Sequence, residues 1–191
     1  MKAGFSIVNS KIKNLIIASL FTAFICIGAW IKIPFVIVPM TLQFFFVNFA
    51  IISQKTEFSV LSVSCYICIG LMGLPVFSGG GGFSYILTPT FGYIFGFLLA
   101  ALSSGIKKLR EHKLIQSLVN IAVIYTVGLT YLYLMSELYL GQDVSFFKII
   151  VSGFLIFIPK DLLSVFLSLS LYRYLQRIGL FTNERNLSNF K

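Results

Sequence analysis

Apolar segments long enough, or nearly long enough, to cross a membrane are what most restricts the fold of this chain. There are six of them, at residues 15–31, 39–53, 58–74, 89–106, 114–134 and 159–175. A helix needs about 20 apolar residues, within a range of about 17–25, to cross the hydrocarbon core. Charged residues make up 11% of the chain, against about 25% in soluble domains. The sequence therefore predicts an all-α membrane protein with six transmembrane helices, forming a single domain over residues 1–191.

Proline divides the last apolar block, residues 146–175, into two parts. Pro159 lies in its middle, and proline either breaks a helix or begins one because it lacks a backbone donor and fixes φ. We therefore expect a short apolar segment at residues 146–158 and a helix that starts at Pro159.

The basic residues predict the topology. Six spans put both termini on one side, and if that side is the cytoplasm it holds 12 of the 15 basic residues, leaving only Lys32, Lys148 and Lys160 outside. This is the distribution that the positive-inside rule describes. Lysines precede the first span, as they precede the apolar region of a signal peptide. The apolar run is long for a signal peptide, however, and more spans follow it. Residues 107–113 then carry a topology signal, and no nucleic-acid partner is expected.

Polar residues follow three prolines at the outer face. The five prolines, at positions 34, 39, 75, 89 and 159, all fall there, and three of them are expected to open helices. Within one turn come Thr41 and Gln43, then Thr90 and Tyr93, then Lys160 and Asp161. The free N–H groups of helix N-termini suit an anionic group. Prolines that merely start helices would explain one such cluster; three of them, beside the glycines 79–82, favour a pocket.

Asp161 is the only acidic residue within a predicted span. A carboxylate among apolar residues near a membrane is costly and usually has a partner or a function. A role as a helix-dipole partner, or in a salt bridge to Lys160, is the alternative to a role in binding.

Motifs for catalysis or metal binding are missing from the sequence. Cys65 and Cys68 form a C-x-x-C, but there is no second pair and the only histidine is His112. We therefore expect the cysteines to pack on a helix face, with no metal, no cofactor and no enzymatic activity. No ATP-binding G-x-x-x-x-G-K-[ST] is present either, so active transport would have to be driven by another protein.

Four segments together resemble the BioY family, the biotin-binding S components of energy-coupling factor transporters. They are VPMTLQFFF (residues 38–46), GLMGLPVFSGGGG (70–82), TPTFGYIFGF (88–97) and FIPKDLL (157–163). The resemblance covers about two-thirds of the chain, with the motifs in the family's order and spacing.

The resemblance implies a subunit of the cell membrane that captures biotin from outside the cell. Its partners would be biotin, the lipid bilayer, a membrane coupling subunit and two cytoplasmic ATPase subunits, which alone would use ATP. The implied substrate-binding residues come from the outer ends of the helices and from the loop between the third and fourth helices: Thr41, Gln43, Phe77, Ser78, Gly79, Gly80, Tyr85, Tyr93, Lys160 and Asp161. An S component for another vitamin or for a biotin relative, a solitary biotin transporter, and a purely structural membrane subunit are the alternatives.

Three positions depart from the family pattern. In the family, the aspartate of the last helix follows a glycine and is followed three residues later by a lysine. In this chain, Lys160 precedes Asp161, and Ser164 takes the position of the family's lysine. Phe91 replaces a glycine of the fourth-helix motif. Either Lys160 supplies the missing cation or the pocket binds its ligand with fewer charges.

Small residues in the first helix match the pattern by which such S components dock. Ala18 with Thr22, and Ser19 with Ala23, have small-xxx-small spacing, which lets another helix approach closely. Ordinary packing within the chain explains the spacing equally well. For the glycines 79–82, we expect a mobile cap over the pocket, because glycine permits positive φ and close backbone approach.

Overall fold

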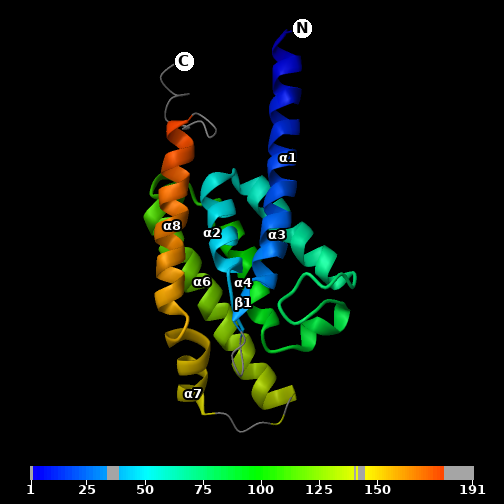
Figure 1. Cartoon of the computed structure of the whole chain (residues 1–191), viewed down its shortest axis with the longest axis vertical. Helices are drawn as coiled ribbons and strands as arrows, with labels where there is room; N and C mark the ends of the chain where they lie inside the picture. The colour runs from blue at the N-terminus through cyan, green and yellow to red at the C-terminus, as the bar shows by residue number, and fades with distance from the viewer. Residues whose placement is uncertain (1, 34–38, 140, 142–144, 179–191) are drawn as a thin grey trace.

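The computed structural model describes residues 2–33, 39–139, 141 and 145–178, and shows a helical bundle (Figure 1). Pro34, Arg185 and Lys191, which entered the topology argument, lie outside the described residues. The longer helices are α1 (Lys2–Trp30), α2 (Gln43–Ser53), α3 (Thr56–Leu71), α4 (Phe91–Ser103), α6 (Lys113–Leu134) and α8 (Ile158–Arg177). The start of α1 and the end of α8 lie at the same end of the bundle.

Shorter elements connect these helices. They are strands β1 (Lys32–Ile33) and β2 (Met40–Thr41), the 3-10 helix η1 (Phe83–Leu87), helices α5 (Lys107–Glu111) and α7 (Phe146–Ile150), and the π-helical turns η2 (Met135–Tyr139) and η3 (Val151–Leu155). The basic stretch between the fourth and fifth expected spans thus contains α5. Pro159 lies in the first turn of α8, which confirms the expected division of the last apolar block.

Three stretches are long and apolar enough to cross a membrane: Ser10–Trp30, Lys113–Tyr139 and Val151–Arg177. Helices α2, α3 and α4 are apolar but shorter. The 11 residues of α2 rise only about 16 Å, against a hydrocarbon core of about 30 Å. The strands β1 and β2 precede α2, and the glycine-containing loop connects α3 to η1 and α4.

The second helix begins later than expected, because a hairpin occupies its predicted start. Pro39 was expected to open the helix, but Met40 and Thr41 pair with Ile33 and Lys32 in an antiparallel ladder. The next amide, that of Leu42, donates to the carbonyl oxygens of Gly28 and Ile31, each at 3.1 Å. These bonds tie the chain to the end of α1, and α2 starts only at Gln43.

The fourth helix begins at Phe91 rather than at Pro89. Thr88 is extended, with φ −82° and ψ 140°, as is usual for a residue that precedes proline. The Phe91 amide then donates to the Thr88 carbonyl oxygen at 3.1 Å, closing a turn around Pro89.

The first helix begins earlier than predicted, since α1 begins at Lys2, well before residue 15. It extends beyond its neighbours (Figure 1).

The core lies where α2, α3, α4, α6 and α8 meet. Helix α4 packs most extensively on α6, α2 packs on α8, and α1 packs on α2 and α3. Fully buried residues of this core include Val47, Val63, Tyr66, Ala100 and Leu132. This packing brings the starts of α2, α4 and α8 to one cavity.

Candidate functional site

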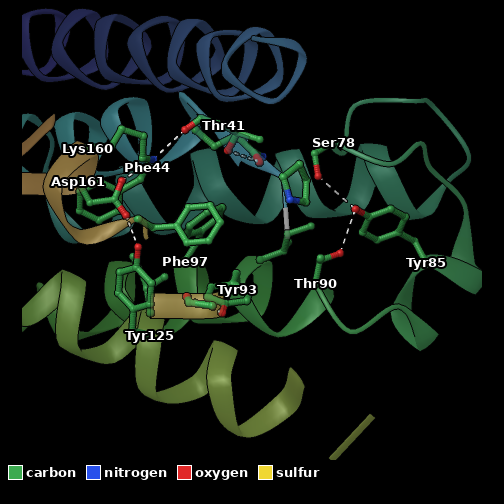
Figure 2. A pocket seen from close by; sticks show the side chains of 16 residues that line it. Thr41, Phe44, Ser78, Tyr85, Thr90, Tyr93, Phe97, Tyr125, Lys160 and Asp161 are labelled. Carbon is green, nitrogen blue, oxygen red and sulfur yellow. Dashed lines mark hydrogen bonds and ion pairs between the residues drawn. The ribbon is translucent and has the colours of Figure 1, made fainter. Parts of the chain in front are cut away.

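Asp161 lies at the polar end of this cavity, in the first turn of α8 (Figure 2). Asp161 is 3% exposed. One carboxylate oxygen forms an ion pair with the Lys160 ammonium, and the other accepts a hydrogen bond from the Tyr125 hydroxyl of α6. Since a buried carboxylate needs such partners, these two contacts orient it at the cavity wall.

Lys160 joins this carboxylate to the hairpin. Its ammonium donates to the Thr41 backbone oxygen at 2.8 Å. Gln43, two residues further on, accepts from the Thr41 hydroxyl at 3.2 Å and donates to the Tyr66 hydroxyl at 2.5 Å. Because α2 starts late, Thr41 has an extended rather than a helical backbone. Its carbonyl oxygen can therefore accept the hydrogen bond from the Lys160 ammonium.

Aromatic side chains form the middle of the cavity. Phe44, Tyr93, Phe97, Tyr125 and Phe157 line it. The Tyr93 ring packs over Gly128, where an added Cβ would lie 2.4 Å from a ring carbon, and its hydroxyl donates to the Gly153 carbonyl oxygen at 2.9 Å. These contacts fix the ring edge-on to Tyr125, with centroids 6.0 Å apart.

A second polar group lies away from Asp161, at the other end of the cavity (Figure 2). The Tyr85 hydroxyl is 3.4 Å from the Ser78 hydroxyl and 3.3 Å from the Thr90 hydroxyl. It also accepts a hydrogen bond from the Gly79 amide at 3.3 Å. This end offers hydroxyl groups, and the Lys32 ammonium donates to the Ser78 backbone oxygen beside them, whereas the other end holds the Lys160–Asp161 pair.

The glycine loop is folded behind this second group. Phe77 and Gly80 exchange backbone hydrogen bonds of 2.9 and 3.2 Å, and the positive φ of Gly80, 129°, closes the turn. Gly81 packs so tightly that an added Cβ would lie 2.1 Å from the Leu74 carbonyl oxygen. The glycines therefore permit a compact turn against the end of α3.

Most of the sequence-predicted substrate residues lie around the cavity. Thr41, Gln43, Ser78, Tyr85, Tyr93, Lys160 and Asp161 line it. Phe77, Gly79 and Gly80 are not among the lining residues. Phe77 is buried in the core between Tyr66 and Tyr85, with ring centroids 5.3 and 4.7 Å away.

Sequence reasoning missed several lining residues. Beyond the predicted set, the cavity is lined by Pro39, Phe44, Thr90, Ile94, Phe97, Ile124, Tyr125, Gly153 and Phe157. Thr90 was singled out with Tyr93 as a polar residue after Pro89, but it was not included among the substrate-binding residues. Tyr125 carries a hydroxyl in the middle of an apolar span, but nothing local distinguishes Phe44, Phe97 or Phe157 among 21 phenylalanines.

The cavity has a volume of about 70 Å³. Pockets for drug-sized ligands measure about 300–1,000 Å³, so a ligand of that size requires the lining side chains to move apart. Within the described residues, no three histidine, cysteine or acidic side chains gather as they would around a metal ion.

The two small-residue pairs of α1 have different surroundings. Ala18 and Thr22 are buried, and the Thr22 hydroxyl donates to the Ser62 carbonyl oxygen of α3 at 3.0 Å. This pair packs within the chain. Ser19 and Ala23 are exposed on the outer side of the helix.

Comparison with known proteins gives a consistent result. A family model described as "BioY family" matches residues 2–180. A probable biotin transporter BioY of Lysinibacillus sphaericus is 38% identical over 156 residues, which are 78% of this chain and 79% of that protein. The biotin transporter BioY of Thermotoga maritima is 39% identical over 121 residues, 61% of this chain and 72% of that protein.

A solved structure has the same fold. It is a crystal structure of the S-component for biotin from an ECF-type ABC transporter, with a TM-score of 0.76 and 28% sequence identity. The alignment covers 88% of this chain and 93% of that one.

Proposed function

The chain belongs to the BioY family, and from this premise we propose that it is the substrate-binding subunit of a biotin uptake transporter. It is a membrane transport protein rather than an enzyme. Biotin is captured in the cavity lined by the starts of α2, α4 and α8 and is then delivered to the cytoplasm.

The ion pair between the buried Asp161 and the partly exposed Lys160 is the observation that carries this proposal. Biotin has a ureido ring with two N–H donors and a carbonyl, an apolar ring, and a carboxylate tail. Asp161 accepts from a ureido N–H, a hydrogen bond strengthened by the charge and by burial. Lys160, which already neutralises Asp161, lies where it donates to the ureido carbonyl.

The arrangement of the rest of the cavity matches the rest of the ligand. The aromatic middle takes the apolar ring, and the hydroxyl groups of Ser78, Tyr85 and Thr90 donate to the tail carboxylate. Placing the tail at this end keeps the two carboxylates apart and puts the tail near the Lys32 ammonium, which donates to the Ser78 backbone oxygen. Because the cavity is small, binding includes an outward movement of the loop that contains Gly79 and Gly80, which acts as a cap.

We further propose that residues 1–191 form one membrane domain that crosses the cell membrane six times, with both termini in the cytoplasm. The common position of the start of α1 and the end of α8 supports an even number of crossings (Figure 1). The short helices α2, α3 and α4 complete their crossings with the adjoining hairpin and loop. The excess of basic residues on one side supports the orientation.

A membrane coupling subunit and two cytoplasmic ATPase subunits are the proposed partners, and this subunit itself needs no cofactor. Ser19 and Ala23 supply the docking face of α1, since their side chains are exposed and small enough for close helix contact. Uptake of labelled biotin in cells that lack the partner subunits tests this dependence: no uptake is expected, and full uptake would identify a solitary transporter.

Equilibrium binding of labelled biotin to the purified chain tests the central proposal. Asp161→Asn should weaken binding about 10- to 100-fold, the range for loss of a hydrogen bond to a charged group. Glu137→Gln removes an exposed carboxylate that does not line the cavity and should change affinity less than twofold. Lack of saturable binding by the unmodified chain would sink the biotin assignment, and tighter binding of another vitamin would replace the ligand.

A further inference from the structure

A second groove lies between the start of α6 and the last part of α8. Its volume is about 460 Å³. None of its lining residues is shared with the aromatic cavity: Glu111, His112, Lys113, Leu114, Ile115, Leu169, Tyr172, Arg173 and Gln176. The biotin proposal makes no use of this groove.

Positive charge dominates the polar side of the groove. Lys113 and Arg173 line it from different helices, and among its described lining residues Glu111 is the single carboxylate and His112 the single histidine. The Lys113 ammonium lies 5.5 Å from the centroid of the Tyr172 ring, and the Gln176 amide donates to the Tyr172 hydroxyl at 2.7 Å. The Tyr172 ring is thus contacted by Lys113 over the ring and by Gln176 at the hydroxyl, and it holds the Lys113 cation at the edge of the groove.

The other side of the groove is apolar and exposed. Leu114 and Ile115 are 54% and 49% exposed, and Leu169 is half-buried. They belong to the two stretches, Lys113–Tyr139 and Val151–Arg177, that are long and apolar enough to cross a membrane. The cationic edge therefore lies where the membrane-facing surface of these helices ends.

We propose that this groove binds an anionic glycerophospholipid. The phosphate group lies between Lys113 and Arg173, and the acyl chains run along Leu114, Ile115 and Leu169. The start of α6 adds the partial positive charge of a helix N-terminus. A water-soluble acidic partner would match the cations but would leave the apolar wall uncovered, whereas a lipid matches both. Basic pockets between transmembrane helices are suited to such headgroups.

Native mass spectrometry of the purified chain tests this proposal, with phosphatidylglycerol compared against phosphatidylcholine of the same acyl chains. The unmodified chain should retain phosphatidylglycerol preferentially. Arg173→Gln and Lys113→Gln should each reduce its retention about fivefold, and the double variant about 25-fold, at the usual contribution of one basic residue near a lipid surface. Both side chains are at the protein surface, so the variants should keep their helix content and their biotin affinity.

Lys55→Gln is the matched control, because Lys55 is an exposed cation before α3 that does not line the groove. It should change lipid retention less than twofold. Equal retention of the two lipids, or an equal loss in the control and the double variant, would overturn the proposal. Displacement of the lipid by glycerol 3-phosphate at similar concentration would also overturn it, since the site would then recognise a soluble phosphate.

Discussion

Two polar clusters connect helices α6 and α8 to the segment of β2 and α2, and they differ in charge. The amide cluster consists of Asn48, Ser117, Asn120 and Ser168, all fully buried. Asn48 donates to Ser117 and Ser168 at 3.1 and 2.8 Å, and Asn120 donates to Asn48 at 2.9 Å. The carboxylate cluster consists of Lys160, Asp161 and Tyr125, together with the Thr41 carbonyl oxygen that holds the lysine.

The difference indicates a division of roles. The amide cluster is neutral, contributes none of the residues that line the cavity, and hydrogen-bonds across three helices, with the Asn120 Oδ1 left without a partner. The carboxylate cluster keeps a full ion pair at the cavity wall, where the pair costs desolvation and gains from a polar ligand. We expect variants in the first cluster to change stability and variants in the second to change binding as well.

Breaking the ion pair from one side should have the largest effect. Lys160→Met leaves the Asp161 charge buried without its cation, and should lower the free energy of unfolding by about 3 kcal/mol. Lys160→Met combined with Asp161→Asn removes both charges and should cost less than Lys160→Met alone. Thermal unfolding in detergent measures both, and simple additivity of the two single variants would contradict a coupled pair.

Asn48→Leu tests the amide cluster. It leaves the Asn120 amide and two serine hydroxyls without their partner, which should cost about 2 kcal/mol of unfolding free energy and lower Tm by roughly 6 °C. Biotin affinity should change less than twofold. Asn14→Leu, on α1 outside the cluster, is the control and should leave Tm nearly unchanged. A large loss of affinity at preserved stability would assign this cluster a direct part in binding.

Tyr125→Phe tests how far the carboxylate depends on its second partner. The variant keeps the ring that packs edge-on to Tyr93 but removes the hydroxyl that donates to Asp161. The biotin dissociation constant should rise about fivefold, the usual effect of one hydrogen bond. Tyr174→Phe alters an exposed tyrosine of α8 and should have no effect in the same titration. If Tyr125→Phe and the unmodified chain bind biotin with equal affinity, the contact with Lys160 is sufficient by itself to orient Asp161.

Ser164→Ala should have the smallest effect. Ser164 occupies the position where the family has a lysine, yet its hydroxyl donates to the Lys160 backbone oxygen of its own helix at 2.9 Å, and it does not line the cavity. Removing this bond should change both biotin affinity and unfolding free energy by less than about 0.5 kcal/mol. A loss of affinity comparable to that of Asp161→Asn would mean that the cation position of the family keeps its importance without a cation.

The sequence determined the class of the protein and much of its site. Apolar segment lengths predicted a membrane protein, Pro159 predicted the start of the last helix, and the four motifs predicted the family. The polar residues after the three prolines were predicted to converge, and Thr41, Gln43, Tyr93, Lys160 and Asp161 do line one cavity. Such features are local, because proline geometry and hydrophobicity act within a few residues of the chain.

Only the tertiary structure decided how these residues are used. Lys160 links Asp161 to Thr41 because the hairpin of β1 and β2 delays α2 and brings the Thr41 carbonyl oxygen within reach. Tyr125 joins them from α6, 36 positions away in sequence, and Phe77 turns into the core instead of the cavity. Partners from distant segments leave no local pattern, since they are set by how helices pack against one another.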